Sequence, residues 1–462
     1  MHPKIPGFSF LFQYVIIPSA KNFILQPTKT LSARLHLPER NFFMKKAVGI
    51  IAEYNPFHNG HAYQIEQSKK MTNANFAVIL MSGDFVQRGA PAIFSKHERT
   101  KMALLGGADI VLELPGSYAT GSAEFFAKGG VGIFHALNCV DFLSFGSESG
   151  NLDACISLAQ ILKEEPADYQ QNLKKNLKQG LSFPSARKDA LETYCQKQDL
   201  TLNEDFLEQP NNILGIEYCK ALLSFHSSIE PVTLKRKGSS YHSTDLSTLY
   251  PSASAIRRAL KKGTPKEKND IPVDMVSSFS AAQPSLVWEH MQMLLSKDTI
   301  IEENDFSLLL KYQLLQHNPE TLCQYADLSL DLSRRIYKQL NHFQSFSQFV
   351  SRLKTKELTY TRISRGLLHA LLGITPVMQG LMPSYVRLLG FRRESSEFLR
   401  IMQKNSQIPL ITKGADYGKV LNSHAASAFE KDLFLSDLYE SVKCAKKQTA
   451  FVNDLQKPPV IL

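Results

Sequence analysis

A short apolar run that leads straight into a glycine-containing turn is the feature that most constrains this fold. The run covers Ala47 to Glu53, and the turn after it reads Tyr-Asn-Pro-Phe-His-Asn-Gly-His and ends at His61. A continuous apolar run of this length is typical of a strand that is buried on both faces of a parallel sheet. Ligands of open α/β sheets bind beyond the carboxyl ends of such strands. The sequence therefore predicts an α/β fold with a binding site at this turn.

The same alternation of apolar runs and helical stretches continues after the turn. Further strands are predicted at Phe76 to Ser82, Asp109 to Leu114, Val140 to Gly146 and Val232 to Lys235. Helices are predicted between them, at His61 to Lys70, Lys96 to Leu105, Ser122 to Leu137 and Leu152 to Leu162. Strands that alternate with helices in this way form a Rossmann-like parallel sheet with crossover helices.

The chain of 462 residues is long enough for two or three domains of about 150 residues each. Residues 44–268 are predicted to form the α/β domain, with a polar, lysine-rich insertion at about 164–210. Residues 269–462 are predicted to form a mainly helical domain, because their pattern is helical rather than alternating. A helix ending at Ile374 is expected there, just before Pro376. The basic stretch 1–43 is expected to be a non-native or disordered extension ahead of Met44.

Composition narrows the class of protein. The formal net charge of +10 favours a polyanionic partner, since clustered lysine and arginine attract phosphates, although a basic solvated surface is the alternative. The six cysteines contain no C-x-x-C pair, so we expect no metal site and reduced thiols in a cytoplasmic protein. After residue 44 there is no apolar run of about 18 residues, so we expect no membrane span.

Two histidines flank a glycine at the end of the turn. His58 and His61 are three residues apart at the start of the next helix, so their side chains can converge on one ligand. A helix N-terminus offers backbone amides and a positive dipole end to phosphates, and Gly60 lets the backbone approach closely. Imidazoles can donate hydrogen bonds to phosphoryl oxygens as charge accumulates in a transition state. We therefore predict that His58 and His61 are catalytic residues of a phosphate-handling site.

A second cluster of polar residues lies at another expected helix start. The sequence Ser-Ala-Ser-Ala-Ile-Arg runs from Ser252 to Arg257, with the arginine about one turn inside the helix. Hydroxyls and amides at a helix N-terminus suit the distal phosphates of a nucleotide, and Arg257 could neutralise them. The alternative is an ordinary serine N-cap. After a histidine turn and a sheet domain, we favour a phosphate site.

Several motifs in one order resemble a known family. The turn resembles the H-x-G-H signature of the nucleotidyltransferase superfamily, and the second cluster resembles its S-x-S-x-I-R signature. Together with GIIAEYNPFHNGH, the segments MSGDFVQRGAPAIFSK, ADIVLELP, SAEFFAKG, FGSE, PNNILGIEY and KRKGSSYH resemble the bacterial tRNA(Met) cytidine acetate ligase family. The likeness is dense over residues 44 to about 265 and looser beyond. One departure is Ala90, which stands where the family has an acid in QRGEPA, and another is Ala62-Tyr63-Gln64 after the turn.

This resemblance implies an enzyme that activates acetate with ATP as acetyl-adenylate and acetylates the wobble cytidine of elongator tRNA(Met) to N(4)-acetylcytidine. It implies ATP as substrate, with Mg²⁺ bridging the phosphates. The implied ATP-binding residues are Ile51, Ala52, Glu53, Tyr54, Asn55, Pro56, Phe57, His58, Asn59, Gly60, His61, Ala62, Tyr63, Gln64, Gly146, Asn211, Asn212, Arg236, Lys237, Ser252, Ser254 and Arg257.

Basic residues are the candidates for RNA contact. In the helical part, Lys354, Lys356, Arg362 and Arg365 interleave with Tyr360, and RNA is recognised through phosphates and bases stacked on aromatic rings. A second basic group includes Arg387, Arg392 and Arg393. Near the sheet, Arg88, Lys96, Arg99 and Lys101 could hold phosphate or RNA. For each group the alternative is a solvated helix face.

Two other functions are compatible with the same signatures. One is an adenylyltransferase that builds a coenzyme from a phosphorylated acceptor, which would not need a further basic helical domain. The other is a non-catalytic RNA-binding protein on the same fold. The presence of His58, His61, Ser254 and Arg257 argues against the second alternative.

Overall fold

The computed structural model describes residues 45–198, 200, 205–237, 250–262, 278–297, 300–355 and 357–462. Residues Lys45–Leu462 form one compact unit. The expected extension 1–43 and the predicted RNA contact Lys356 lie outside the described residues. Among the helices in these ranges, none is both long enough and apolar enough to cross a membrane.

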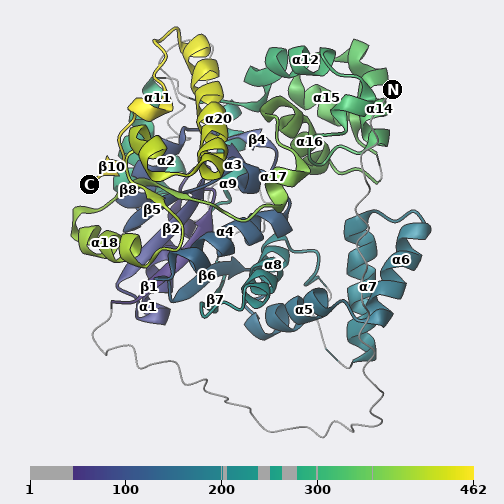
Figure 1. Cartoon of the computed structure of the whole chain (residues 1–462), viewed down its shortest axis with the longest axis horizontal. Helices are drawn as coiled ribbons and strands as arrows, with labels where there is room; N and C mark the ends of the chain where they lie inside the picture. Colours follow the sequence, from purple (N-terminus) through teal and green to yellow (C-terminus); the bar gives the residue numbers. More distant parts are fainter. Residues whose placement is uncertain are drawn as a thin grey trace, which may run out of the picture. The chain divides into compact units, whose positions relative to one another are not determined.

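A largely parallel sheet forms the centre of the unit (Figure 1). Within the described ranges it has eight strands, in the order β10-β8-β5-β2-β1-β6-β7, with β9 paired to β8. The central strand β1 pairs in parallel with β2 and β6. Only β8 runs antiparallel to its neighbour β5 within this order. The strands are β1 Ala47–Ala52, β2 Phe76–Ser82, β5 Ile110–Leu114, β6 Phe142–Ser147, β7 Glu230–Lys235, β8 Val386–Phe391, β9 Leu410–Ile411 and β10 Val460–Ile461. The predicted α/β class and parallel sheet are confirmed.

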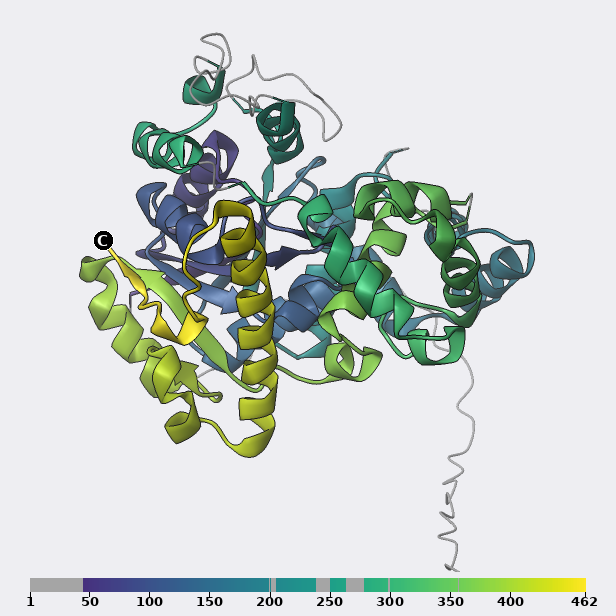
Figure 2. The same cartoon turned by 90° about the horizontal axis from the view of Figure 1, so that it is seen from above.

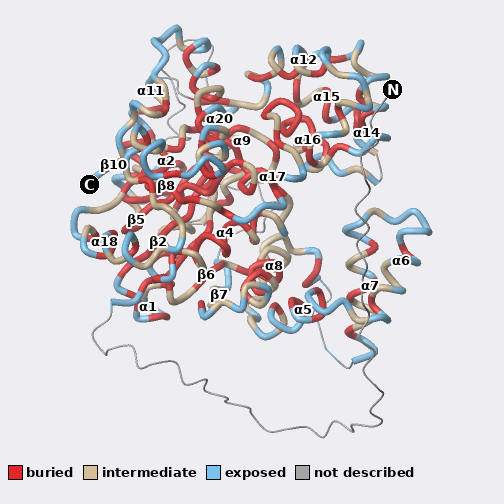
Figure 3. Tube along the Cα trace, in the orientation of Figure 1, coloured by how far each residue is buried: buried red, intermediate tan, exposed pale blue. Residues whose placement is uncertain are grey.

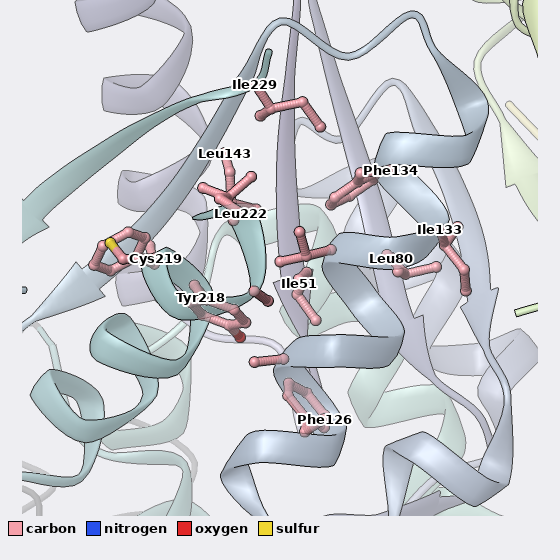
Figure 4. Close-up of a cluster of buried hydrophobic side chains, with 14 of the residues drawn as sticks. Ile51, Leu80, Phe126, Ile133, Phe134, Leu143, Tyr218, Cys219, Leu222 and Ile229 are labelled. Carbon is pink, nitrogen blue, oxygen red and sulfur yellow. The ribbon is translucent and has the colours of Figure 1, made fainter. Parts of the chain in front are cut away.

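Helices cover both faces of the sheet because successive strand residues point to opposite sides. Ile51 of β1 and Leu80 of β2 face a core that includes Phe134 and Leu222, on the helices α4 and α8 (Figure 4). The alternate residues, such as Ile50, face a second core beneath α1, α2, α9 and α11. These helices are α1 Asn59–Thr72, α2 Lys96–Leu105, α4 Ala123–Leu137, α5 Leu152–Glu164, α8 Pro210–Ser224, α9 Ala253–Lys262 and α11 Ser285–Ser296.

A separate group of helices has its own core. This helical group contains α12 Ser307–Leu315, α13 Pro319–Leu322, α14 Leu330–Gln339, α15 Phe346–Leu353 and α16 Tyr360–Leu372. Leu435 and Tyr439 of the long helix α20 (Ser423–Lys447) join that core. Phe429, nearer the start of α20, packs instead with Tyr385 just before β8. Figure 2 shows α20 running between the sheet and the helical group. Because its side chains pack in a core on each side, this helix connects the two parts.

The C-terminal part differs from the expected second domain. Residues 269–462 do contain the helical group, but β8, β9 and β10 from the same stretch extend the central sheet. The expected boundary near residue 268 therefore does not separate sheet from helices. The physical reason is that β8 pairs with the edge of β5, a contact across more than 270 residues that local pattern does not reveal. The remaining elements are the hairpin β3 Phe85–Val86 and β4 Ala90–Pro91, α3 Gly116–Ala119, α17 Pro376–Gly380, α18 Ser396–Asn405 and α19 Tyr417–Val420.

The expected insertion at 164–210 forms a helical hairpin. Its helices are α6 Ala167–Lys178 and α7 Phe183–Lys197. Tyr169, Leu191 and Cys195 are buried members of the larger core cluster, while much of the outer side of α6 and α7 is exposed (Figure 3). The lysines therefore solvate the outer face of this hairpin.

A buried ionic network joins the start of α2 to the C-terminal part. Lys96 Nζ lies 2.7 Å from Glu113 Oε1 on β5 and 2.9 Å from Asp454 Oδ2, and it donates to Ser436 Oγ on α20. Arg387 of β8 pairs with the same Asp454. Burial alone would lower the pKa of Lys96, but Asp454 and Glu113 raise it above its usual value. The charge is therefore retained inside the protein.

We predict that Lys96→Met destabilises the fold by about 3–5 kcal/mol, because it leaves Glu113 and Asp454 as buried charges that share Arg387, with His97 as a further hydrogen-bond partner of Asp454. Urea unfolding monitored by circular dichroism measures the loss. Lys70→Met is the matched control, because its ion pair with Glu66 is exposed and should be worth less than about 1 kcal/mol. Equal stability of the two variants would contradict the prediction.

Candidate active site

A cavity of about 530 Å³ lies at the carboxyl ends of β1 and β6, where the sequence places the site. Side chains from the turn after β1, the β3–β4 loop, and the starts of α4, α8, α9 and α16 surround it. The lining residues are Ile51, Ala52, Glu53, Tyr54, Asn55, His58, His61, Gln64, Gln87, Arg88, Ala123, Phe126, Phe145, Gly146, Pro210, Asn211, Ile213, Leu214, Tyr218, Arg236, Ser252, Ala253, Ser254, Arg257, Thr361 and Arg365.

The two histidines of the turn form the N-terminal cap of α1. His58 Nδ1 accepts a hydrogen bond from the Gly60 amide at 3.0 Å, and His61 Nδ1 accepts one from the His58 amide at 3.3 Å. Their rings stack with centroids 3.7 Å apart. A neutral imidazole that accepts at Nδ1 carries its proton on Nε2. Both histidines therefore present an Nε2–H donor, which is the role expected for stabilising phosphate charge.

Burial keeps both rings neutral. The pKa of His58 is lowered to about 3, by burial first and then by the positive charges of Arg236 and Arg257. The pKa of His61 is held well below its usual value by burial, by His58 and by Arg236. The histidines therefore remain hydrogen-bond donors without a net charge across the physiological pH range.

Arginines bring positive charge to the same cavity. Arg257 of α9 donates to the Asn55 carbonyl at 2.5 Å and to Ser254 Oγ at 3.2 Å, so the second sequence cluster lies against the first turn. Ser252 Oγ accepts from the Ala255 amide at 3.1 Å and caps α9. Arg236, just after β7, also lines the cavity. Two neutral donors and two guanidinium groups together suit a polyphosphate.

The structure brings together most, but not all, of the expected nucleotide residues. Pro56, Phe57, Asn59, Gly60, Ala62, Tyr63, Asn212 and Lys237 do not line the cavity. Phe57 is fully buried in the core beneath α1. Asn212 is also buried, where its Oδ1 accepts from the Glu148 amide and its Nδ2 donates to the Phe206 carbonyl.

Several lining residues were not predicted as site residues from the sequence. Gln87, Phe126, Tyr218 and Thr361 come from four different elements. One signal could have located Gln87, because it lies in the segment MSGDFVQRGAPAIFSK that carries the family resemblance. In the structure Gly89, two residues later, has a positive φ of 76°. A Cβ at Gly89 would lie 2.4 Å from the Arg365 amide nitrogen, so only glycine allows the β3–β4 loop to touch α16.

The basic residues expected to bind phosphate or RNA have different positions. Lys96 and Arg387 belong to the buried ionic network, and Arg99 is also fully buried, so none of the three can meet a macromolecule. Arg365 lines the cavity and forms a bidentate pair with Asp327. Lys354 is exposed and Arg362 partly exposed, outside the cavity lining.

Comparison with known proteins shows which family this chain belongs to. The family model described as HIGH Nucleotidyl Transferase matches residues 44–454. The tRNA(Met) cytidine acetate ligase of Halothermothrix orenii is 40% identical over 410 residues, covering 85% of this chain and 94% of that protein. The enzyme of the same description from Clostridium kluyveri strain ATCC 8527 is 38% identical over 428 residues, covering 90% and 99%. The chain belongs to the tRNA(Met) cytidine acetate ligase family of HIGH nucleotidyl transferases.

Solved structures agree with this family assignment. The crystal structure of Thermotoga maritima TmcAL bound with alpha-thio ATP matches with a TM-score of 0.81 and 28% identity. The match covers 90% of this chain and 99% of that chain. The apo form of the same protein gives a TM-score of 0.82. The tRNA(Met) cytidine acetate ligase fold therefore includes the sheet, the helical group and α20.

The histidine cap of this ligase-family fold makes stability depend on pH. The folded pKa of His58 lies below its unfolded value of 6.5, so acid favours the unfolded chain, and stability is lost as pH falls from about 6.5 toward 3. Between pH 7 and pH 5 the loss from His58 is about 2 kcal/mol. We predict that His58→Gln reduces the acid-induced fall in unfolding free energy by about this amount, measured by urea titration at both pH values. The exposed His424→Gln should leave the fall unchanged, and an equal effect of both variants would refute the prediction.

Proposed function

We propose that this protein activates acetate with ATP to acetyl-adenylate and transfers the acetyl group to the wobble cytidine of elongator tRNA(Met). The main observation behind this proposal is that four groups line one cavity. They are the Nε2–H donors of His58 and His61 and the guanidinium groups of Arg236 and Arg257. The ligase relatives and the ATP-analogue complex of Thermotoga maritima TmcAL support the same assignment. All three substrates, acetate, ATP and the tRNA, would be met in the cytoplasm.

The first step needs positioning and charge stabilisation rather than a protein nucleophile. A carboxylate oxygen of acetate attacks the α-phosphorus of ATP, the bond to the β-phosphate oxygen breaks, and pyrophosphate leaves. Negative charge increases on the phosphoryl oxygens during this displacement. Donors that are already fixed in place stabilise that charge without reorganising. His58 and His61 are fixed by their backbone hydrogen bonds, and Arg257 by Asn55 and Ser254.

We also propose that Mg²⁺ accompanies the nucleotide. In the described part of the chain there is no cluster of three or more histidine, cysteine, aspartate or glutamate residues that could hold a metal by itself. Mg²⁺ commonly binds through substrate phosphates, one or two carboxylates and waters, so such a cluster is not required. The phosphates, held by Arg236 and Arg257, would be its main ligands, and the ion would neutralise charge on them.

The proposed RNA surface lies on the helical group at the cavity mouth. Thr361 and Arg365, in the first turns of α16, line the cavity. Lys354 and Tyr360 are exposed nearby in the chain, and Arg362 is partly exposed. A basic surface with an exposed aromatic ring suits an anticodon loop, whose phosphates and unstacked bases are accessible.

We predict exchange of labelled pyrophosphate into ATP that depends on acetate. His58→Ala and His61→Ala should each slow it by roughly a hundredfold or more, because each removes one donor to developing charge. Circular dichroism at pH 7 provides the folding control. Wild-type exchange that proceeds without acetate, or only with a phosphorylated acceptor, would contradict the proposal and favour a coenzyme-forming adenylyltransferase.

We predict that Lys354→Ala combined with Arg362→Ala weakens tRNA binding and reduces its salt dependence by about 0.7–0.9 per lost phosphate contact. Filter binding across a salt series measures both quantities. Arg365 is kept, because its removal would break its bidentate ion pair with Asp327. Lys413→Ala with Lys419→Ala, two exposed lysines that pair with Asp416, is the matched control. An unchanged slope in the first variant would place the RNA surface elsewhere.

A further inference from the structure

Glu53 is fixed at the end of the central strand from two directions. Its Oε1 accepts a hydrogen bond from the Gln87 amide in the β3–β4 loop at 2.9 Å. Its main-chain carbonyl accepts one from Arg99 Nη1 at 2.7 Å. The side chain lines the cavity, so its carboxylate is held in place beside the expected reaction centre.

The carboxylate of Glu53 is the one proton acceptor suited to an amine among the described lining residues. No other aspartate or glutamate from the described ranges lines the cavity. His58 and His61 use Nδ1 to accept backbone amides and face the cavity as donors. The remaining polar side chains there are arginines, amides and hydroxyls, none of which is a base near neutral pH.

Three buried hydrogen-bonding groups in the same cavity have no hydrogen-bond partner among the described residues. The Tyr54 hydroxyl, Gln87 Nε2 and the Tyr218 hydroxyl are all shielded from solvent. Burial raises the pKa of Tyr218, and the charge of Glu53 adds to this, so the phenol stays protonated. Buried polar groups without partners are rare in proteins, and each one calls for an explanation. A bound ligand that offers acceptors to these three donors explains their lack of protein partners.

The combination of a carboxylate and an adjacent amide donor matches one edge of cytosine. The exocyclic N4 amine of cytosine donates hydrogen bonds, while N3 and O2 accept them. Carboxylates are the usual partners of cytosine N4 in proteins. Uracil presents an acceptor in place of the amine and a donor at N3, so Glu53 would face a carbonyl oxygen.

We propose that Glu53 and Gln87 bind the Watson–Crick edge of the acceptor cytosine, and that Glu53 receives the proton of its amine. This inference rests on the proposed function and assigns the acceptor half of the same site. N4 attacks the acetyl carbonyl carbon of acetyl-adenylate, forming the C–N bond. The bond from that carbon to the phosphate oxygen breaks and AMP leaves. One N4 proton passes to the Glu53 carboxylate and then to water.

The test separates the two half-reactions in Glu53→Gln, which keeps an oxygen to accept the Gln87 amide but removes the base. The first half-reaction is measured as acetate-dependent pyrophosphate exchange, and as acetyl-hydroxamate formed when hydroxylamine traps the acetyl-adenylate. The second is measured as single-turnover transfer of labelled acetyl to tRNA. We expect transfer to fall at least a hundredfold more than exchange, since a general base contributes roughly a hundredfold or more.

Three outcomes overturn the proposal. Exchange and transfer that fall in proportion would assign Glu53 to the nucleotide or its metal ion. Transfer that falls no more than exchange, with both near the wild-type rates, would show that another group takes the proton. Full transfer activity in Glu53→Gln combined with loss of tRNA binding would assign Glu53 to RNA docking alone. A wild-type protein without acetate-dependent exchange would instead refute the proposed function, so the two failures are distinguishable.

A second variant tests base recognition separately. Gln87→Leu keeps the backbone amide that binds Glu53 but removes the Nε2 donor, and we expect about a tenfold loss in the transfer step relative to exchange. Glu66→Gln, which changes an exposed carboxylate on α1, is the matched control for both variants. A tRNA with uridine at the acceptor position should not compete for transfer. Equal inhibition by the uridine and cytidine tRNAs, in wild type and Gln87→Leu alike, would contradict recognition through this edge.

Discussion

The buried guanidinium of Arg99 is the interaction on which the site geometry depends. Its three nitrogens donate to the carbonyls of Phe94, Glu53, Ser82 and Gly83, so one side chain ties the ends of β1 and β2 to the start of α2. Strand ends leave carbonyls without ladder partners, and burying them unpaired would be costly. Arg99 satisfies these carbonyls and thereby fixes where the turn after β1 and the β3–β4 loop begin. The positions of the histidine pair and of Glu53 depend on these hydrogen bonds.

Much of the sheet was predictable because its signals are local. The strand expected at Phe76 to Ser82 and the helix expected from Lys96 to Leu105 have the same bounds in the structure. Apolar runs and helix caps are properties of neighbouring residues, so sequence alone reveals them. The strand β8 is itself a short apolar run, but its place in the sheet depends on its pairing with β5 and on Arg387, whose partners are distant in sequence. Such long-range pairing also explains why the predicted domain boundary near residue 268 does not separate the sheet from the helices.

The residues of the site also fall into two groups, those with local sequence signals and those without them. His58, His61 and Arg257 lie in short motifs at helix starts, where spacing alone indicates a phosphate site, and the structure gathers them around one cavity. Gln87 and Tyr218 lie inside two of the segments that carry the family resemblance, but those segments do not single them out as site residues, and only the fold brings them to that cavity. For the basic residues of α2 the sequence suggested a binding role that the structure does not support, because a sequence shows which residues are charged but not which are buried. In the sequence Lys96 and Arg99 resemble part of a phosphate-binding helix face, but in the structure both are buried and hold neighbouring elements together.

The antiparallel strand β8 has a consequence for synthesis. While the protein is being made, β5 leaves the ribosome long before residues 386–391 are available to cover its edge. An uncovered strand edge is a template for pairing with other chains. Lys96 likewise waits for Asp454, which is added 358 residues later. The nascent chain therefore passes through a long interval in which its sheet is open on one side, and chaperone protection during that interval would decide the yield of soluble enzyme.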